Sequence, residues 1–241
     1  MITNHLVPSS TMSAPVELLR RVPLLQSLSD AELRTIANLS TRRRVRARET
    51  VVQQSEPGNE LFVLVSGHLK VISTDPEGRD AGLNVMGPGE VFGEVALLDG
   101  GPRSATIVAL GEPCELLVIR REHWLRFLKE SPDTAVQLLG VLAGRLRKLT
   151  ERTEDIAFLR VGERLAKTIA ALASTYGEKH ADGSIRLQLK MSQQEMGDLV
   201  GATRESANKQ IRAWEQEGLV SQDHGHLIIR DLEKLRGYRE G

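Results

Sequence analysis

Short apolar runs punctuated by glycine fill the chain between residues 45 and 120. The clearest are VVQQSEPGNELFVLVSGHLKVIS, GRDAGLNVMGPGEVFGEVALLDGG and RSATIVALGEPCELLVI. Such runs are rich in valine and isoleucine and end at Gly, Pro or Asn turns, which predicts antiparallel strands. The pattern therefore predicts a compact β-barrel or sandwich in the first half of the chain.

The hydrophobic period changes after Trp124. The stretch DTAVQLLGVLAGRLRKLTERTEDIAFL holds neither proline nor a turn cluster, which predicts one long helix. An amphipathic helix packed on its own domain would show the same pattern, but we favour a parallel coiled coil of two copies because charged residues cover the remaining surface. The spacings of three and four residues define a seam of Ala135, Leu139, Leu142, Leu146, Leu149, Thr153 and Ile156.

The C-terminal part of the chain predicts two short helices joined by a turn. Ser192 and Glu195 have the spacing of a capping box that opens the first helix, and Gly201 ends this helix. Thr203 is placed to cap the second helix, which ends near Gly218. Two helices joined by a short glycine turn form a helix-turn-helix. The run LVSQDHGHLIIRD then predicts a β-hairpin, which would make the unit winged.

A hinge is expected where the long helix meets the C-terminal unit, at FLRVGE, residues 158–163, because Gly162 offers backbone freedom. The run GERLAKTIAALASTYG predicts a further helix with Gly177 as its C-cap, and SIRLQLK predicts a strand. Since the hinge connects the two halves of the chain, we expect any signal between them to pass through it.

Composition and charge narrow the class of protein. The chain has 241 residues, 40% of them hydrophobic and 27% charged, as in a globular protein of one or two domains. Lys+Arg and Asp+Glu number 32 each, which leaves nucleic acid open as a partner because a local basic patch matters more than the total. The single cysteine, Cys114, the absence of a secretory signal and the absence of a long apolar run predict a cytoplasmic protein without a membrane partner.

Two motifs ahead of the helix-turn-helix carry a family resemblance. The first is VVQQSEPGNELFVLVSG, residues 51–67, which has Ser55 where family members usually show glycine. The second is FGEVALLDGGPRSATIVA, residues 92–109, which matches a phosphate-binding cassette throughout. With these motifs, the chain resembles the CRP/FNR family of cyclic-nucleotide-responsive transcription regulators from about residue 20 to its end.

The resemblance implies an α+β fold. It consists of a jelly-roll-like, cyclic-nucleotide-binding β-barrel, a long dimerisation helix and a C-terminal winged helix-turn-helix. The implied boundaries are a flexible N-terminal arm at 1–14, the barrel domain at 15–130, the dimerisation helix and hinge at 131–160, and the DNA-binding domain at 161–241.

The resemblance also implies a pocket for a cyclic nucleotide. Such a ligand brings one phosphodiester charge and a ribose 2′-hydroxyl, so Arg103 is expected to bind the phosphate and Glu94 the hydroxyl. A buried ion pair of these two residues, with a structural role only, is the alternative. Cyclic AMP is the default ligand, and cGMP, another effector or ligand-independent action remain alternatives.

The purine end of the ligand is expected to meet the long helix of both subunits. Thr150 matches a family hydroxyl that reaches from the partner chain, whereas Leu149 stands where the best-known cAMP responders have threonine. Arg145 is expected to reach Glu94 from the same helix. The implied ligand-binding residues are Gly93, Glu94, Val95, Ala96, Arg103, Ser104, Arg145, Leu149 and Thr150.

The second helix of the helix-turn-helix predicts a DNA-reading surface. Arginine can read guanine O6 and N7, and glutamate can accept from cytosine N4, as Arg204 and Glu205 would here. Lys209 replaces a family arginine, so specificity at that base should relax. The resemblance implies a homodimer that binds double-stranded DNA at a twofold-symmetric site, with RNA polymerase as a further partner. The implied DNA-binding residues are Ser192, Gln194, Thr203, Arg204, Glu205, Ser206, Lys209 and Arg212.

An enzyme built on the same barrel would need clustered metal ligands. Only His68 lies in the strand region, with His123 just beyond it, so the barrel has no H-x-H pattern, and the chain shows no nucleophile motif. Cys114 alone cannot hold an iron–sulfur cluster. We therefore predict a regulator that is not an enzyme and carries no metal.

Overall fold

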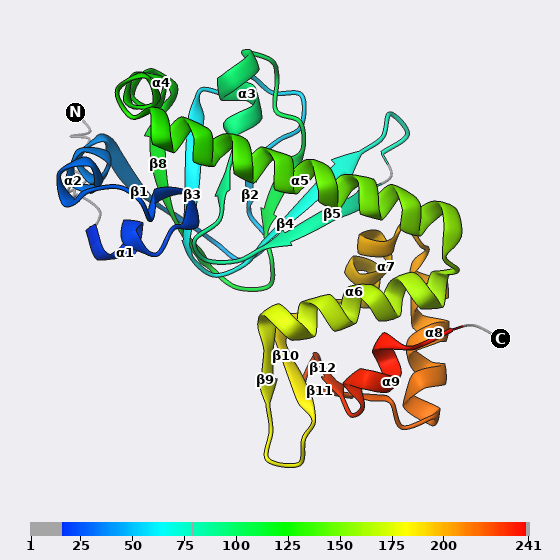
Figure 1. The fold of residues 1–241 in the computed structure, drawn as a ribbon. Helices are drawn as coiled ribbons and strands as arrows, with labels where there is room; N and C mark the ends of the chain where they lie inside the picture. Colours follow the sequence, from blue (N-terminus) through cyan, green and yellow to red (C-terminus); the bar gives the residue numbers. More distant parts are fainter. Residues whose placement is uncertain (1–15, 79, 240–241) are drawn as a thin grey trace, which may run out of the picture.

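Two four-stranded antiparallel sheets face each other in the first half of the chain (Figure 1). The structure, a computed structural model, describes residues 16–78 and 80–239, so the arm expected at 1–14 lies outside the described residues. One sheet has the strand order β1-β8-β3-β6, and the other β2-β7-β4-β5. The strands are β1 Ser40–Val45, β2 Thr50–Val52, β3 Glu60–Ser66, β4 Leu69–Thr74, β5 Asp80–Met86, β6 Val91–Phe92, β7 Thr106–Ala109 and β8 Cys114–Arg120.

The apolar runs predicted as strands fill the space between these sheets. Phe62 on β3 stacks on Phe92 of β6 with ring centroids 4.8 Å apart, and Leu64 and Leu116 are fully buried beside them. This burial is the main force that holds the sheets together, because each large side chain removed from water contributes roughly 1.5–3 kcal/mol. The β-rich first half is confirmed.

Short helices cover the ends of the sheets. Sequence analysis missed the helix at Asp30–Leu39, although Ser29 and Glu32 form the same capping box that revealed a later helix. Trp124 anchors another missed helix in the N-terminal core, where it is 1% exposed. These elements are α1 Val16–Arg20, the 3-10 helix η1 Pro23–Leu25, α2 Asp30–Leu39, α3 Glu94–Asp99 and α4 Arg121–Glu130.

The predicted long helix is present as α5, Pro132–Phe158, which runs along the sheet domain (Figure 1). Leu138 is buried, whereas Leu139, Leu146, Leu149 and Ile156 are at least half exposed, as expected for a seam. Leu142 is only partly exposed, and it lines a cavity beside the sheet together with Leu146 and Leu149. It lies one turn after Leu138, so it shares the face that packs on its own domain.

The C-terminal unit confirms the predicted helix-turn-helix and wing. Ser192 accepts from the Glu195 amide, Gly201 ends the first helix in the left-handed region, and Thr203 caps the second helix. The hairpin tip has positive φ at both His224 and Gly225, as a tight two-residue turn requires. The elements are α6 Val161–Tyr176, β9 Gly177–Lys179, β10 Ile185–Lys190, α7 Gln193–Val200, α8 Arg204–Gln216, β11 Val220–Asp223, β12 His226–Ile229 and α9 Leu232–Arg236.

Gly177 is the C-cap of α6, as predicted, and Gly162 lies in the first turn of the same helix. Gly177 is extended, with φ −91° and ψ 135°, and is needed because an added Cβ would lie 2.2 Å from the carbonyl oxygen of Ala173. Gly162 is buried and already has helical backbone. The break between α5 and α6 is confined to Leu159 and Arg160, both with extended backbone.

Two further features are absent from the part of the chain that the structure describes. Between residues 16 and 239, leaving out 79, no helix combines the length and apolarity required to span a bilayer. Within the same residues, no three His, Cys, Asp or Glu side chains lie close enough together to hold a metal ion.

Candidate ligand pocket and DNA-reading surface

A cavity of about 440 Å³ lies between the β2-β7-β4-β5 sheet, α3 and α5. This volume falls within the usual range for small-molecule sites. Apolar side chains such as Val71, Met86 and Ile107 form the wall on the sheet. A larger hollow of about 670 Å³ also touches Arg103, but neither Glu94 nor Ser104 lines it. We therefore take the cavity against α5 as the candidate pocket and call it the α5 cavity.

Arg103 is held by backbone oxygens at the edge of the α5 cavity. It is 6% exposed, and its guanidinium donates to the carbonyls of Gly93 at 3.1 Å and Glu60 at 2.9 Å. Burial lowers the pKa of Arg103, while the carboxylates of Glu60 and Glu94 act in the opposite direction. An added Cβ at Gly93 would lie 2.5 Å from Nη1, so this approach requires glycine. Two hydrogen bonds leave three of the five guanidinium N–H groups for other acceptors.

Glu94 pairs with the long helix. Its carboxylate is 3% exposed and accepts from Arg145, as the sequence predicted, and Arg145 also donates to the Val91 carbonyl. Because the Glu94 carboxylate is buried, loss of Arg145 would leave a buried charge without a partner and would destabilise the protein. The two side chains that one loop brings together, Glu94 and Arg103, thus have different partners in this structure.

The α5 cavity gathers nearly all of the ligand-binding residues that the resemblance implied. Thr150 is the exception, because it is exposed and its hydroxyl donates to the Leu146 carbonyl at 3.1 Å. Sequence analysis missed Arg152, which lies two turns after Arg145 on one helix face, a spacing that could have revealed it. The implied residues that line the cavity are Gly93, Glu94, Val95, Ala96, Arg103, Ser104, Arg145 and Leu149.

The second site lies on α8. Arg204, Glu205 and Lys209 are exposed, whereas Ile211 and Trp214 are fully buried on the opposite face. This division matches the predicted reading surface. Ser206 and Arg212 are also exposed, and the Thr203 side chain caps the helix.

Sequence analysis missed Asn208 on the same helix. Its buried Oδ1 has no hydrogen-bond partner among the described residues, and it lines a shallow groove with Glu205, Lys209 and Arg212. It follows Glu205 by three residues, which places both on one helix face.

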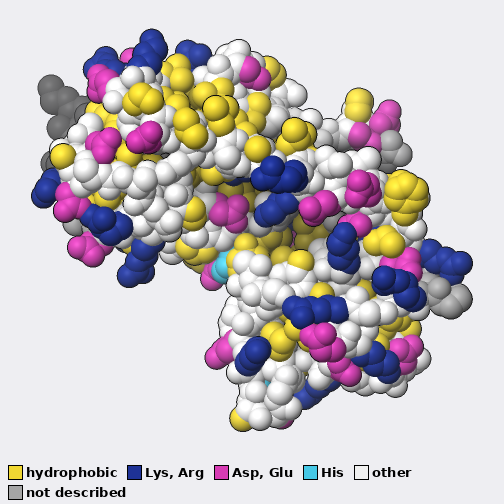
Figure 2. All heavy atoms as spheres, in the orientation of Figure 1, with side chains coloured by type: hydrophobic (Ala, Val, Ile, Leu, Met, Phe, Trp, Pro, Cys, Tyr) yellow, Lys and Arg dark blue, Asp and Glu magenta, His cyan; other side chains and the backbone are white. Residues whose placement is uncertain are grey.

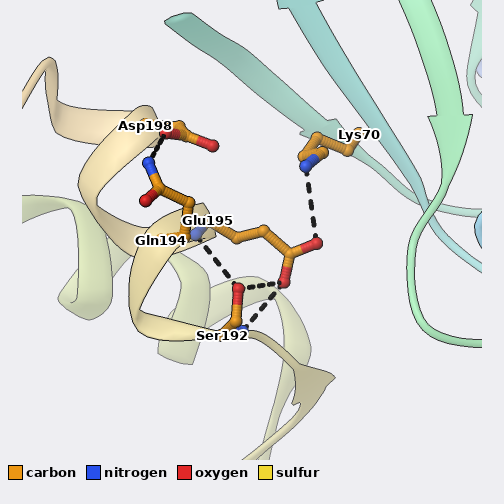
Figure 3. Close-up of polar contacts among 5 residues, drawn as sticks. All are labelled: Lys70, Ser192, Gln194, Glu195 and Asp198. Atoms are coloured by element: carbon orange, nitrogen blue, oxygen red, sulfur yellow. Dashed lines mark hydrogen bonds and ion pairs between the residues drawn. The ribbon is translucent and has the colours of Figure 1, made fainter. Parts of the chain in front are cut away.

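Two of the implied DNA-binding residues, Ser192 and Gln194, lie at the start of α7. The Ser192 hydroxyl serves in the capping box, and Gln194 donates to Asp198 at 2.7 Å (Figure 3). Both residues are thus held in place by their own helix. The structure therefore brings these two residues to one helix end and the reading residues to the next helix.

Comparison with known proteins decides the family. Residues 42–131 match the cyclic nucleotide-binding domain, and residues 163–238 match the Crp-like helix-turn-helix domain. The chain is 33% identical over 186 residues to the CRP-like cAMP-activated global transcriptional regulator of Mycobacterium tuberculosis, covering 77% of this chain and 82% of the relative. The chain belongs to the CRP/FNR family. It is therefore related to DNA-binding transcription regulators and not to enzymes.

Other CRP/FNR relatives agree with this assignment. The cAMP-activated global transcriptional regulator CRP of Haemophilus influenzae is 30% identical over 184 residues, which are 76% of this chain and 80% of the relative. The structure of the c-di-GMP responsive global regulator CLP of Xanthomonas campestris has a TM-score of 0.74 and 25% identity, covering 84% of this chain and all of that one. The expected α+β fold is confirmed.

Proposed function

We propose that this CRP/FNR protein is a homodimer whose binding to DNA is controlled by cAMP in the α5 cavity. The observation that carries this proposal is the meeting of Glu94, Arg103 and Ser104 with α5 around one cavity. An arginine fork suits a phosphodiester, and a carboxylate suits the ribose hydroxyl. We assign the ligand domain to 15–130, the dimerisation helix and hinge to 131–160 and the DNA-binding domain to 161–241.

The choice of cAMP rests on the cAMP-activated relatives from Mycobacterium tuberculosis and Haemophilus influenzae. A cyclic dinucleotide is the second candidate. The cations Arg145, Lys148 and Arg152 line the cavity beside Arg103, and a dinucleotide would bring a second phosphodiester for them.

Titration calorimetry of the purified protein with cAMP, cGMP and cyclic di-GMP tests the ligand. We expect saturable binding of cAMP with one molecule per chain and weaker binding of cGMP. Tighter binding of cyclic di-GMP would replace cAMP in the proposal, and an absence of heat with all three would refute a cyclic-nucleotide effector.

The dimer is proposed from the solvent face of α5. Figure 2 shows hydrophobic side chains exposed on the face of the molecule where α5 runs. On α5 itself, Leu139 and Leu146 are 64% and 66% exposed. A second copy of the same face would bury these leucines. A twofold-symmetric dimer places its two α8 helices on DNA half-sites about one helical turn, ~34 Å, apart. For a regulator that acts at promoters, we also propose RNA polymerase as a partner and the cytoplasm as the location.

Substitution of one reading residue tests the DNA surface. Arg204→Ala should weaken binding to a specific site by about 1–3 kcal/mol and relax one guanine position, with little loss on random DNA. Arg212→Ala is the matched control, because loss of a phosphate contact should weaken binding to both DNAs alike. Affinities are measured by fluorescence anisotropy at one salt concentration. If Arg204→Ala lowers the affinity for the specific site and for random DNA equally, Arg204 contacts phosphate only and reads no base.

A further inference from the structure

The helix-turn-helix packs directly on the sheet domain through α7 and β5. Gly82 on β5 has no side chain, and a Cβ added there would lie 3.0 Å from the backbone of both Asp198 and Leu199. Val85 of β5 and Leu110 after β7 belong to the same hydrophobic cluster as the core of the C-terminal unit. The two units therefore share close-packed surface besides their covalent connection.

A polar contact joins the sheet domain to the other end of α7. The ammonium of Lys70 on β4 lies 3.4 Å from the Glu195 carboxylate, and the same carboxylate accepts from the backbone and hydroxyl of Ser192 (Figure 3). Lys70 and Glu195 side chains are 15% and 24% exposed, so water screens the pair only in part. Such pairs fix geometry more than they stabilise a fold.

Arg152 connects the contact of Gly82 with α7 to the α5 cavity. Its side chain lines the cavity, and its guanidinium donates to the carbonyls of Leu83, at 2.7 Å, and Gly82. Burial lowers the pKa of Arg152, and the nearby cation Arg164 lowers it further. Arg164 in turn donates to the carbonyl of Val200 at the end of α7, at 2.9 Å. A continuous set of contacts thus runs from the cavity through Arg152 and Gly82 to the C-terminal half of α7.

We propose that Arg152 is a positioning residue that couples the α5 cavity to the helix-turn-helix within one chain, by way of β5. A ligand in the cavity meets the guanidinium that holds the carbonyls of residues 82 and 83. Gly82 lies on the α7 backbone with no side chain between them, so a shift of β5 displaces α7 instead of being absorbed by a flexible group. The three-residue turn after α7 then moves α8 with it.

This connection offers a second route besides the hinge expected at residues 158–163. The break between α5 and α6 lies at Leu159 and Arg160, and the contact of Gly82 with α7 bypasses both residues. The inference rests on the proposed function, since it requires a ligand in the α5 cavity and DNA on α8.

The test compares DNA affinity with and without saturating cAMP at one salt concentration, and takes the ratio as the coupling factor. Gly82→Ala should push α7 away from β5, so we expect its coupling factor to fall by about fivefold or more, with cAMP affinity in the absence of DNA nearly unchanged. Gly237→Ala is the control, because its added Cβ has only an ordinary contact at 3.5 Å. Lys70→Met should lower the coupling factor more mildly, and exposed Lys129→Met should not.

Arg152 itself is tested by two variants. Arg152→Met removes the hold on both carbonyls and should lower the coupling factor as much as Gly82→Ala. Arg152→Lys keeps the charge but lacks the planar fork, so it should recover only part of the coupling. This difference separates positioning from a purely electrostatic effect.

Three outcomes decide the matter. Coupling factors of wild-type size in Gly82→Ala and Arg152→Met, with cAMP still bound, would overturn the inference while leaving the proposed function intact. A wild-type protein whose DNA affinity ignores every nucleotide would overturn both. If Gly82→Ala does not fold, the coupling factors of Arg152→Met and Lys70→Met take its place. Coupling factors of wild-type size in these two variants would overturn the inference.

Discussion

Arg103→Leu should lower cAMP affinity by about one and a half to three decades. The variant removes the cation that we place on the ligand phosphate, and the loss of a charge-assisted contact with its balanced desolvation costs about 2–4 kcal/mol. Titration calorimetry measures the effect. Arg103→Lys should be intermediate, because it keeps the charge without the fork. Glu94→Ala should weaken cAMP binding less than Arg103→Leu does, because the ligand group that loses its partner is an uncharged ribose hydroxyl.

Controls for this variant follow from the contacts of Arg103. Its guanidinium binds the carbonyls of Gly93 and Glu60, so thermal unfolding must show that Arg103→Leu remains folded. Arg126 is an exposed arginine on α4 that is distant from Arg103 in the sequence. Arg126→Leu should therefore leave the titration with cAMP unchanged. An Arg103→Leu protein that is folded and binds cAMP as the wild type does would eliminate the pocket as we place it.

The double variant Leu139→Asp, Leu146→Asp is expected to be monomeric and to lose nearly all affinity for a twofold-symmetric DNA site. Each leucine buried at a dimer seam contributes roughly 1.5–3 kcal/mol, and buried carboxylates oppose association further. Both residues are more than 60% exposed in the single chain, so the protomer itself should still fold.

Light scattering at several protein concentrations measures the mass of this variant. Leu98→Asp on α3 is the matched control, since Leu98 is also exposed, at 40%, but lies off the α5 face. A dimeric double variant would show that the solvent face of α5 is not the interface. A monomer that still binds the DNA site as tightly as the wild type would separate dimerisation from DNA recognition.

Local signals in the sequence predicted the C-terminal unit well. The capping box of Ser192 and Glu195, the left-handed Gly201 and the tip at His224 and Gly225 all depend on residues that are neighbours in the chain. A capping box needs only four consecutive residues, so the surrounding fold has little influence on it. Such features can therefore be predicted from the amino-acid sequence alone.

Contacts between distant segments were the part that periodicity did not reveal. The burial of Leu138 and the partial burial of Leu142 were not predicted, because a helix with apolar residues on two faces does not tell which face meets its own domain. Nothing local marks Lys70 as a partner of Glu195, or Gly82 as the residue that lies on α7. The pocket was recognised through a family motif, while the contact of α7 with β5 required the fold itself.

The most direct test of the account is the affinity of the wild-type protein for its DNA site, measured at fixed salt with and without saturating cAMP. Coupling between two sites is typically ~1–3 kcal/mol, so cAMP should tighten DNA binding about 5- to 150-fold, and DNA should tighten cAMP binding by the same factor. If cAMP binds to the α5 cavity but DNA affinity is identical in both conditions, control of DNA binding by this nucleotide is contradicted.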